Sequence, residues 1–407
     1  MGHPNDCVMR SLLITISIAL GALALGKGPD VTAASAIVMD ADSGKVLFQK
    51  NANVPRFPAS TTKVMTSLLL VEKVLPEEQI VAPSDVESIT GSKMHLKPGE
   101  KVPAKDMLYA LMLRSANDGC YAVALHIAGS VPAFAKLMNQ RAQEIGCTHT
   151  NFHNPNGLND PQHLTTAHDL ALIAREAMKY PEFQDAVKTT SYSIRRSMDQ
   201  KDTLMVNKDK LLIFDPSSEG IKTGWTIPAG HCFVGASTRN GYRVISVVLK
   251  SKDWKADTEA LWDWAFDNHD RELITTANEP LQDLKVDGGA EDKVSVASPR
   301  DLYLTVPKGV QPEYQMTIKP EPVIEAPIAI GQRIGTILIT DSQGAKMFVP
   351  AVATKEIPRR GIAQAATQDW KPWLGLTLVG GTLYVRGRSR RSRPYVTRRP
   401  KKRVRKA

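Results

Sequence analysis

The sequence predicts an α+β fold, in which a large first domain of helices and antiparallel strands precedes a small all-β domain. Two patterns favour this class. Apolar residues recur at helical spacing in the first half of the chain, within residues 60–73 and 107–128. Short β-branched runs separated by turn signals follow, over residues 220–249 and again over residues 294–349. Three short polar motifs lie within these elements of the first domain.

The first helical stretch opens with Ser60-Thr61-Thr62-Lys63 and contains no internal glycine or proline. On a helix, Ser60 and Lys63 are i,i+3 neighbours on one face. A serine hydroxyl becomes a good nucleophile when a neighbouring base takes its proton, and Lys63 can do this only as a neutral amine. The alternative is an N-capping serine followed by a solvated lysine, which is the more common meaning of this motif in isolation.

The second motif, Ser115-Ala116-Asn117, separates two apolar stretches. Residues 107–113 predict a buried helix, and the next helix carries an apolar stripe at 3.6-residue spacing. That stripe consists of Cys120, Val123, Ala124, Ile127 and Ala128. We therefore expect a polar turn that directs Ser115 and Asn117 into a cleft. An ordinary helix connection with a capping residue is the alternative.

The third motif, Lys222-Thr223-Gly224, lies on a predicted strand. A turn at residues 228–230, a second apolar strand and an Asn240-Gly241 turn follow, and Asn-Gly strongly indicates a hairpin. A Lys-Thr pair on such a strand most often belongs to its solvent-exposed face. Beside the other two motifs it favours the wall of an active site, where Lys222 would be a second cation that lowers the pKa of Lys63.

Together the motifs resemble those of the penicilloyl-serine peptidases, in particular the low-molecular-mass penicillin-binding proteins that act as D-alanyl-D-alanine carboxypeptidases. Five further segments share the resemblance: residues 36–47, 111–118, 154–161, 165–172 and 219–225. The resemblance implies a β-lactamase/DD-peptidase-like catalytic domain over residues 34–269, with an antiparallel sheet and a helical subdomain. A weaker resemblance implies a β-rich C-terminal domain over residues 270–358.

The resemblance also implies catalytic roles for three residues of the first two motifs and a substrate-binding role for a fourth. Ser60 would be the nucleophile and Lys63 its base. Ser115 would carry the proton toward the leaving amine, and Asn117 would bind the substrate amide.

Four residues of the third motif region would bind substrate by the same resemblance. Lys222 and Thr223 would hold the terminal carboxylate of the stem peptide, beside Gly224. Backbone N–H groups of Ser60 and Trp225 would meet the oxyanion, the preorganised donor pair that acyl transfer needs.

The activity implied is removal of the terminal D-alanine of peptidoglycan stem pentapeptides through an acyl-serine, with β-lactams as covalent inhibitors and no cofactor. A D,D-endopeptidase would use identical motifs. A serine β-lactamase would carry Glu-x-x-Leu-Asn, but Pro155 stands where that glutamate would precede Leu158-Asn159. A non-catalytic wall-binding protein would have no reason to keep Ser60, Lys63, Ser115 and Lys222 together.

The remaining histidines and cysteines predict no further chemistry. His149 and His153 lie in a polar loop without an intervening glutamate, so we expect no metal site. Cys120 and Cys232 sit in apolar patterns, which predicts buried free thiols rather than a disulfide.

Both ends of the chain predict export and membrane association. Residues 1–26 resemble a signal peptide, with Arg10 before an apolar run and an Ala-x-Ala site, whether translation begins at Met1 or Met9. Residues 359–385 include an apolar, aromatic segment, and residues 386–407 contain 12 Lys and Arg and no acid. This combination favours an anionic membrane surface outside the cytoplasm, such as the periplasmic face, and no nucleic acid is expected there. A solvated, disordered extension is the alternative.

Overall fold

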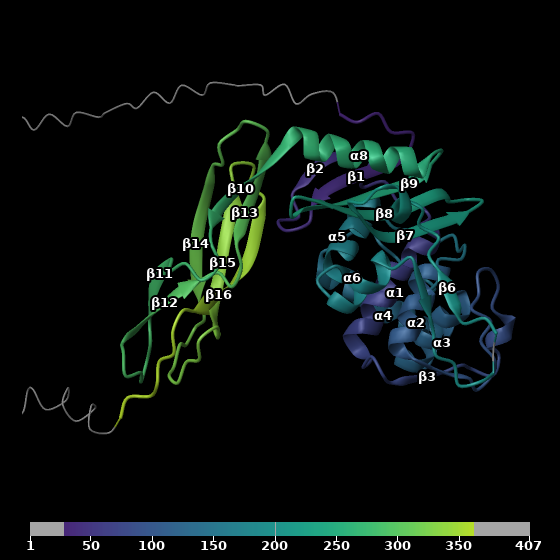
Figure 1. The fold of residues 1–407 in the computed structure, drawn as a ribbon, viewed down its shortest axis with the longest axis horizontal. Coiled ribbons are helices and arrows are strands. Elements are labelled where there is room, and N and C mark those ends of the chain that lie inside the picture. Colours follow the sequence, from purple (N-terminus) through teal and green to yellow (C-terminus); the bar gives the residue numbers. More distant parts are fainter. Residues whose placement is uncertain (1–27, 200, 362–407) are drawn as a thin grey trace, which may run out of the picture. The chain divides into compact units, whose positions relative to one another are not determined.

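The computed structural model describes residues 28–199 and 201–361, which form two compact units (Figure 1). The first unit contains the described residues up to Asp270 together with Val306–Val310, and the second contains Arg271–Thr305 and residues 311–361. The predicted signal peptide, the basic tail and almost all of residues 359–385 lie outside the described residues. Among the described residues, no single helix is long and apolar enough to cross a bilayer. One pair of helices, Asn117–Ala128 with Val131–Ile145, passes that test together, but it is bent by 83°.

A five-stranded antiparallel sheet in the order β2-β1-β9-β8-β7 forms the centre of the first unit. Its strands are β1 Ser35–Asp40, β2 Val46–Lys50, β7 Ser218–Thr226, β8 Gly230–Arg239 and β9 Tyr242–Ser251. The predicted Asn-Gly hairpin is confirmed between β8 and β9, where Asn240 (φ 52°) and Gly241 (φ 75°) both take the left-handed conformation that such turns require. The strand with the third motif, β7, is an edge of the sheet.

Helices cover both faces of this sheet (Figure 1). All six residues of β1 are buried, and alternate side chains enter different cores. Ile37 and Met39 join the core with α5 (Ala167–Ala177), whereas Ala36 and Val38 join the core with α8 (Trp254–Asn268). The two-sided burial explains why the strand is a continuous apolar run rather than an alternating one.

The helical part of the first unit lies on the α5 side of the sheet. It consists of α1 Lys63–Lys73, α2 Ala104–Tyr109, α3 Asn117–Ala128, α4 Val131–Ile145 and α6 Pro181–Lys188. Two small hairpins, β3 Gln79–Val81 with β4 Lys101–Pro103 and β5 Ser191–Ser193 with β6 Leu204–Val206, lie at its margins, and the short α7, Leu211–Phe214, precedes β7.

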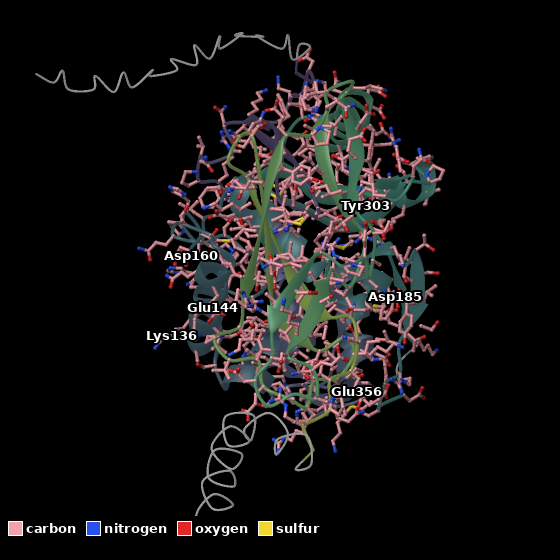
Figure 2. All side chains as sticks on the ribbon, turned by 90° about the vertical axis from the view of Figure 1, so that its left-hand side faces the viewer. Lys136, Glu144, Asp160, Asp185, Tyr303 and Glu356 are labelled. Atoms are coloured by element: carbon pink, nitrogen blue, oxygen red, sulfur yellow. The ribbon has the colours of Figure 1, made fainter. Side chains whose placement is uncertain are left out.

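Helix α4 shows how sequence determines these elements. Phe134, Met138 and Ala142 are buried at helical spacing, while Lys136 and Glu144 on the same helix are exposed and point outward (Figure 2). The Ser130 hydroxyl caps the helix by accepting a hydrogen bond from the Ala133 N–H.

Two segments that were predicted as regular helix depart from it. Residues Ala59–Thr62 form a 3₁₀ turn, and α1 begins only at Lys63. Ala59 has a positive φ of 48°, which an α-helix does not accommodate. Residues Ala110–Arg114 form a π-helical turn after α2, and Ser115 follows it in the left-handed conformation with φ 64°. Both departures lie at the first two motifs.

The second unit is built from strands, and with the mixed first unit it confirms the predicted α+β class. One sheet has the order β11-β12-β16-β15-β14, and β10 pairs with β13. The bounds are β10 His269–Thr275, β11 Gln282–Lys285, β12 Lys293–Ala297, β13 Leu302–Pro307, β14 Tyr314–Pro320, β15 Arg333–Asp341 and β16 Lys346–Ala353. The sequence did not predict β10 and β11, which bury few of their side chains and are mostly polar.

Candidate active site

The turn before α1 holds the predicted nucleophile beside the predicted base. In a 3₁₀ turn, residues i and i+3 eclipse one another. The Lys63 Nζ therefore lies 3.1 Å from the Ser60 Oγ, at hydrogen-bond distance. The Thr61 hydroxyl donates to the Pro58 carbonyl over 2.7 Å and closes the turn from the other side. The predicted i,i+3 pair is thus present, on a tighter turn than an α-helix provides.

Three acceptors surround the Lys63 amine, which is fully buried. Besides the Ser60 hydroxyl, they are the Asn117 Oδ1 at 2.8 Å and the backbone carbonyl of Asn156 at 2.7 Å. Burial lowers the pKa of Lys63 from 10.5 to about 8, because the interior disfavours the charged form. The nearby Lys208 lowers this pKa further, while Cys120 and Asp118 act in the opposite direction.

The third motif supplies the second cation of the site. Lys222 is also fully buried, and burial followed by repulsion from Lys63 and Lys208 holds its pKa well below its usual range. Repulsion between two ammonium groups is mutual, so charge on Lys222 disfavours charge on Lys63 in turn, which agrees with the role that the sequence suggested for Lys222. Lys208 is a further cation that lowers the pKa of both lysines, and the sequence did not predict it.

The second motif divides between the end of the π-helical turn and the start of α3. Asn117 is the first residue of α3, and its Nδ2 donates to the Thr90 carbonyl over 2.7 Å while its Oδ1 faces Lys63. Ser115 is buried, and its hydroxyl makes no hydrogen bond within the described part of the chain. The structure thus joins Asn117 to Lys63, whereas among the described residues the Ser115 hydroxyl has no hydrogen-bond partner and only its backbone N–H donates, to the Ala110 carbonyl.

Strand β7 runs directly past the nucleophile. A Cβ on Gly224 would lie 3.0 Å from the Ser60 backbone nitrogen, so a larger residue would push the nucleophile's turn away. Thr223 is half-buried, and the Trp225 side chain is 57% exposed at the same edge strand. The third motif therefore lies next to the backbone nitrogen of Ser60.

Sequence reasoning missed the part of the site formed by the loop before α5. The Asn156 carbonyl accepts from Lys63, and the Pro155 carbonyl accepts from the Thr66 hydroxyl over 2.6 Å. Backbone acceptors leave no signature in a sequence. Within the resembling segment 154–161, the residue type that reflects this packing is Gly157: its φ is +83°, and a Cβ there would lie 1.8 Å from the Ala59 carbonyl oxygen.

A buried histidine fixes this loop to the nucleophile's turn. The His163 Nδ1 accepts the His153 backbone N–H over 3.0 Å, so the proton of the neutral ring is on Nε2 and is donated to the Thr62 hydroxyl over 2.9 Å. Burial lowers the pKa of His163 to about 4, which keeps the ring neutral at neutral pH.

A buried carboxylate fixes the loop on the other side of Asn117. Asp118 accepts the backbone N–H groups of Met94 and Leu96, each over 3.0 Å. The same loop supplies the Ser92 carbonyl, which accepts the Asn117 N–H. The three described cysteines are buried and free, and Cys120 lies among these groups with its pKa raised by burial to about 11.

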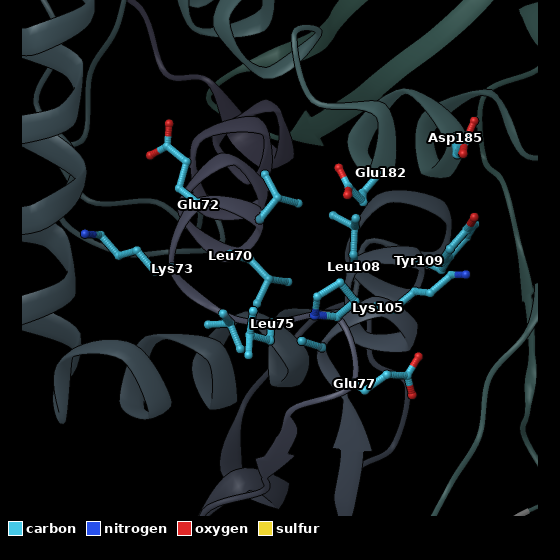
Figure 3. Close-up of a pocket in the computed structure, with 14 residues that line it drawn as sticks. Leu70, Glu72, Lys73, Leu75, Glu77, Lys105, Leu108, Tyr109, Glu182 and Asp185 are labelled. Atoms are coloured by element: carbon cyan, nitrogen blue, oxygen red, sulfur yellow. The ribbon is translucent and has the colours of Figure 1, made fainter. Parts of the chain in front are cut away.

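A separate cavity of about 520 Å³ lies between the ends of α1, α2 and α6 (Figure 3). Its lining includes the apolar side chains of Leu70, Leu75 and Leu108 and the charged side chains of Glu182 and Lys105. None of the motif residues lines this cavity.

Two sequence models of known families match the chain. The model described as D-alanyl-D-alanine carboxypeptidase matches residues 24–253, which is more than half of the chain. The model of the C-terminal domain of penicillin-binding protein 5 matches residues 270–359. The chain belongs to the D-alanyl-D-alanine carboxypeptidase family.

Individual relatives agree with this membership. The chain is 31% identical over 350 residues to the D-alanyl-D-alanine carboxypeptidase DacF of Bacillus subtilis, covering 84% of this chain and 90% of the relative. It is 30% identical over 347 residues to DacA of Escherichia coli K12, covering 81% and 85%. Among solved structures, penicillin-binding protein 5 of Haemophilus influenzae matches with a TM-score of 0.63 and 27% identity, covering 82% of this chain and all of that one.

These findings confirm the predicted family, fold class and enzyme class. The chain is a serine-type D-Ala-D-Ala carboxypeptidase of the low-molecular-mass penicillin-binding group, and the β-lactamase and endopeptidase alternatives are not favoured.

The close approach at Gly157 gives a test of the site's geometry. Gly157→Ala places a Cβ against the Ala59 carbonyl, so we expect the nucleophile's turn to shift and covalent labelling by fluorescent penicillin to slow by about 100-fold, as for a displacement of about 1 Å in other enzymes. Gly129→Ala is the matched control, because Gly129 has a similar φ of 73° but no atom within 4 Å of such a Cβ. Equal labelling by both variants would contradict the assigned contact.

Proposed function

We propose that the chain removes the terminal D-alanine of peptidoglycan stem pentapeptides through an acyl-enzyme on Ser60, and that β-lactams acylate the same serine. The observation that carries this assignment is the fully buried Lys63 amine 3.1 Å from the Ser60 hydroxyl. A base of lowered pKa beside a hydroxyl is the arrangement that activates a serine nucleophile.

The acceptors around Lys63 set the direction in which it takes a proton. A neutral amine has two N–H groups and one lone pair. The carbonyl oxygens of Asn117 and Asn156 can only accept, so they take both N–H groups. The lone pair then points to the Ser60 hydroxyl, the third neighbour, which can donate. Transfer of the Ser60 proton to Lys63 accompanies attack of the Ser60 Oγ on the penultimate D-alanine carbonyl.

The third motif supports binding of an extended peptide. As an edge strand, β7 presents backbone groups that a substrate peptide can join as an added strand. Lys222 and Thr223 hold the terminal carboxylate beside Gly224, and Asn117 binds the adjacent amide. The N–H groups of Ser60 and Trp225 stabilise the oxyanion, and Ser115 passes the proton to the departing D-alanine.

The absence of a β-lactamase's deacylating glutamate favours a peptidase over a β-lactamase. The position of the expected glutamate is taken by Pro155, whose carbonyl is used by Thr66. In the deacylation step, Lys63 is then the group that can activate the incoming water.

The remaining assignments concern the rest of the chain. Residues 1–26 are a removable export signal, residues 34–269 the catalytic domain and residues 270–358 a β-rich domain. Residues 359–385 and the basic tail, 386–407, bring the enzyme to the outer face of the cytoplasmic membrane. The composition of both ends supports this location.

Mass spectrometry of a purified muropeptide pentapeptide tests the activity. We expect loss of one terminal alanine, and Ser60→Ala should abolish both this loss and labelling by fluorescent penicillin, because no other described group takes the nucleophile's place beside Lys63. Circular dichroism confirms that the variant is folded. Cleavage of cross-linked dimers alone would assign an endopeptidase instead, and labelling that survives in Ser60→Ala would overturn the assignment of the nucleophile.

The acylation rate should depend on the protonation of Lys63. With a pKa of about 8, Lys63 is protonated at lower pH and cannot accept a proton, so the rate should fall about tenfold for each pH unit below that value. Lys63→Arg should be inactive at all these pH values, because a guanidinium does not deprotonate. Stopped-flow acylation by a fluorescent β-lactam measures both. Near-normal acylation of Lys63→Arg would assign the base elsewhere.

Truncation after Gln364 tests the function of the C-terminal end. Each basic residue near an anionic surface contributes at most about 1 kcal/mol, and salt screens the attraction. We expect full-length protein to sediment with anionic vesicles at low salt but less at high salt, and the truncated protein to remain free. Soluble pentapeptide should still be hydrolysed, because all catalytic motifs precede the truncation. Equal vesicle binding by both proteins would favour a simple solvated extension.

A further inference from the structure

A buried arginine with no role in the proposed mechanism lies in the connection between β5 and β6. The side chain of Arg196 is 2% exposed and is paired with Glu100, whose side chain is fully buried. The guanidinium donates to both carboxylate oxygens of Glu100, over 2.6 and 2.9 Å. A buried ion pair is tolerated only where the remaining hydrogen-bonding groups of both partners are also satisfied. The partners of the other N–H groups of Arg196 therefore indicate what this pair holds together.

The three remaining N–H groups of Arg196 all donate to backbone carbonyls. Two of these carbonyls belong to Met94 and His95, over 2.9 and 3.1 Å, and the third belongs to Asp202, over 2.8 Å. All five N–H groups of the guanidinium therefore have an acceptor. The side chain joins three segments: the β5–β6 connection, Glu100 before β4, and the loop that contains Met94 and His95.

This loop, residues 90–97, is bound by charged groups through its N–H groups and through its carbonyls. The N–H groups of Met94 and Leu96 both donate to the Asp118 carboxylate over 3.0 Å. The carbonyls of Met94 and His95 accept from the guanidinium. His95 has a φ of 61°, which a residue other than glycine keeps only where its surroundings hold it. The guanidinium is thus the cationic half of the contacts that fix the loop.

The same loop holds Asn117, the residue whose amide bonds the Lys63 amine. The Ser92 carbonyl accepts the Asn117 N–H over 2.7 Å, and the Thr90 carbonyl accepts its Nδ2, also over 2.7 Å. The Asn117 Oδ1 then accepts from Lys63 over 2.8 Å. The packing is tight, since a Cβ on Gly91 would lie 2.5 Å from the Asn117 Nδ2. A shift of the loop must therefore move the amide that orients the base.

A second route leads from Arg196 to the turn of the second motif. Asp202, whose carbonyl accepts from Arg196, also accepts from Arg114 through its Oδ1 over 2.6 Å. Arg114 immediately precedes Ser115, and its Nε donates to the Lys93 carbonyl over 2.9 Å. The β5–β6 connection therefore reaches the second motif through Arg114 as well as through the loop.

We propose that Arg196 and Asp202 are positioning residues for acylation: by fixing the 90–97 loop and Arg114, they keep the Asn117 amide in place beside the base. The inference rests on the proposed function, because it takes Lys63 as that base. Neither residue touches a reacting atom. They act through the hydrogen bonds that the loop makes to Asn117.

The first test replaces Arg196 by lysine, which keeps the charge but offers three N–H groups where five acceptors wait. We expect acylation by a fluorescent penicillin, measured by stopped flow, to slow about tenfold, as for a displacement well below 1 Å. Arg175→Lys is the matched control. Arg175 also donates to two loop carbonyls, those of Ala41 and Asp42, over 2.8 and 2.7 Å, but it holds the turn between β1 and β2. Its variant should acylate at the wild-type rate.

Asp202→Ala tests the second residue with less risk to the fold, because this side chain is 36% exposed. The backbone carbonyl that Arg196 uses remains, and only the pair with Arg114 is lost. We expect acylation to slow about threefold, as for loss of a partly exposed ion pair. Circular dichroism confirms that each variant is folded. A wild-type acylation rate in either folded variant would overturn the role of the residue concerned.

A double-mutant cycle with Asn117→Ala distinguishes positioning from a general loosening of the fold. If both residues act through the Asn117 amide, removing that amide removes their effect. Arg196→Lys and Asp202→Ala should then each slow acylation less than about twofold in the Asn117→Ala background, measured by intact-protein mass spectrometry. A loosened fold would slow the reaction by the same factor in both backgrounds, and equal factors would overturn the proposal.

The cycle also separates this inference from the proposed function. If Asn117→Ala acylates slowly while Arg196→Lys and Asp202→Ala keep the wild-type rate, the positioning roles are wrong and the assigned site stands. If Asn117→Ala itself acylates at the wild-type rate, the role of the Asn117 amide beside the base is wrong and the inference falls with it.

Discussion

The burial of one lysine amine is the constraint on which the rest of the active site depends. Lys63 has no contact with solvent, so each of its N–H groups must find an acceptor inside the protein. The acceptors come from three segments that are far apart in the sequence: the turn of Ser60, the start of α3 with Asn117, and the loop with Asn156. A loose position of any segment would leave a buried donor unpaired. The structure around the site can be understood as the means of holding these three segments together.

A buried histidine, a buried carboxylate and two glycines hold these three segments in place while Lys63 gains and loses its proton. His163 anchors the loop of Asn156 to Thr62, and its low pKa of about 4 means that it stays neutral over the range in which Lys63 titrates. Asp118 receives two backbone N–H groups and anchors the loop beside α3. Gly157 and Gly224 bring backbones against the nucleophile's turn, which no pH change affects. The geometry is therefore independent of the protonation step that it supports.

The sequence predicted the residue types of the site better than their surroundings. Residue spacing located Ser60, Lys63 and Asn117, and the Asn-Gly turn predicted the hairpin that places β7, because both depend on local geometry. The 3₁₀ and π-helical turns were missed, since each depends on packing against distant segments. The Asn156 carbonyl could not be predicted, because every residue has a carbonyl. Lys208 was missed because a charge matters here through burial, which is a tertiary property.

In the proposed mechanism the two buried lysines need opposite charge states. Lys63 must be neutral to accept a proton, and Lys222 must be charged to bind a carboxylate. Two buried ammonium groups that repel each other titrate as a coupled pair, and the free pair holds one charge more easily than two. Burial and repulsion between cations lower the pKa values of both lysines. An incoming carboxylate stabilises charge on Lys222, and that charge in turn lowers the pKa of Lys63. Substrate binding therefore favours the state in which the base is ready to act.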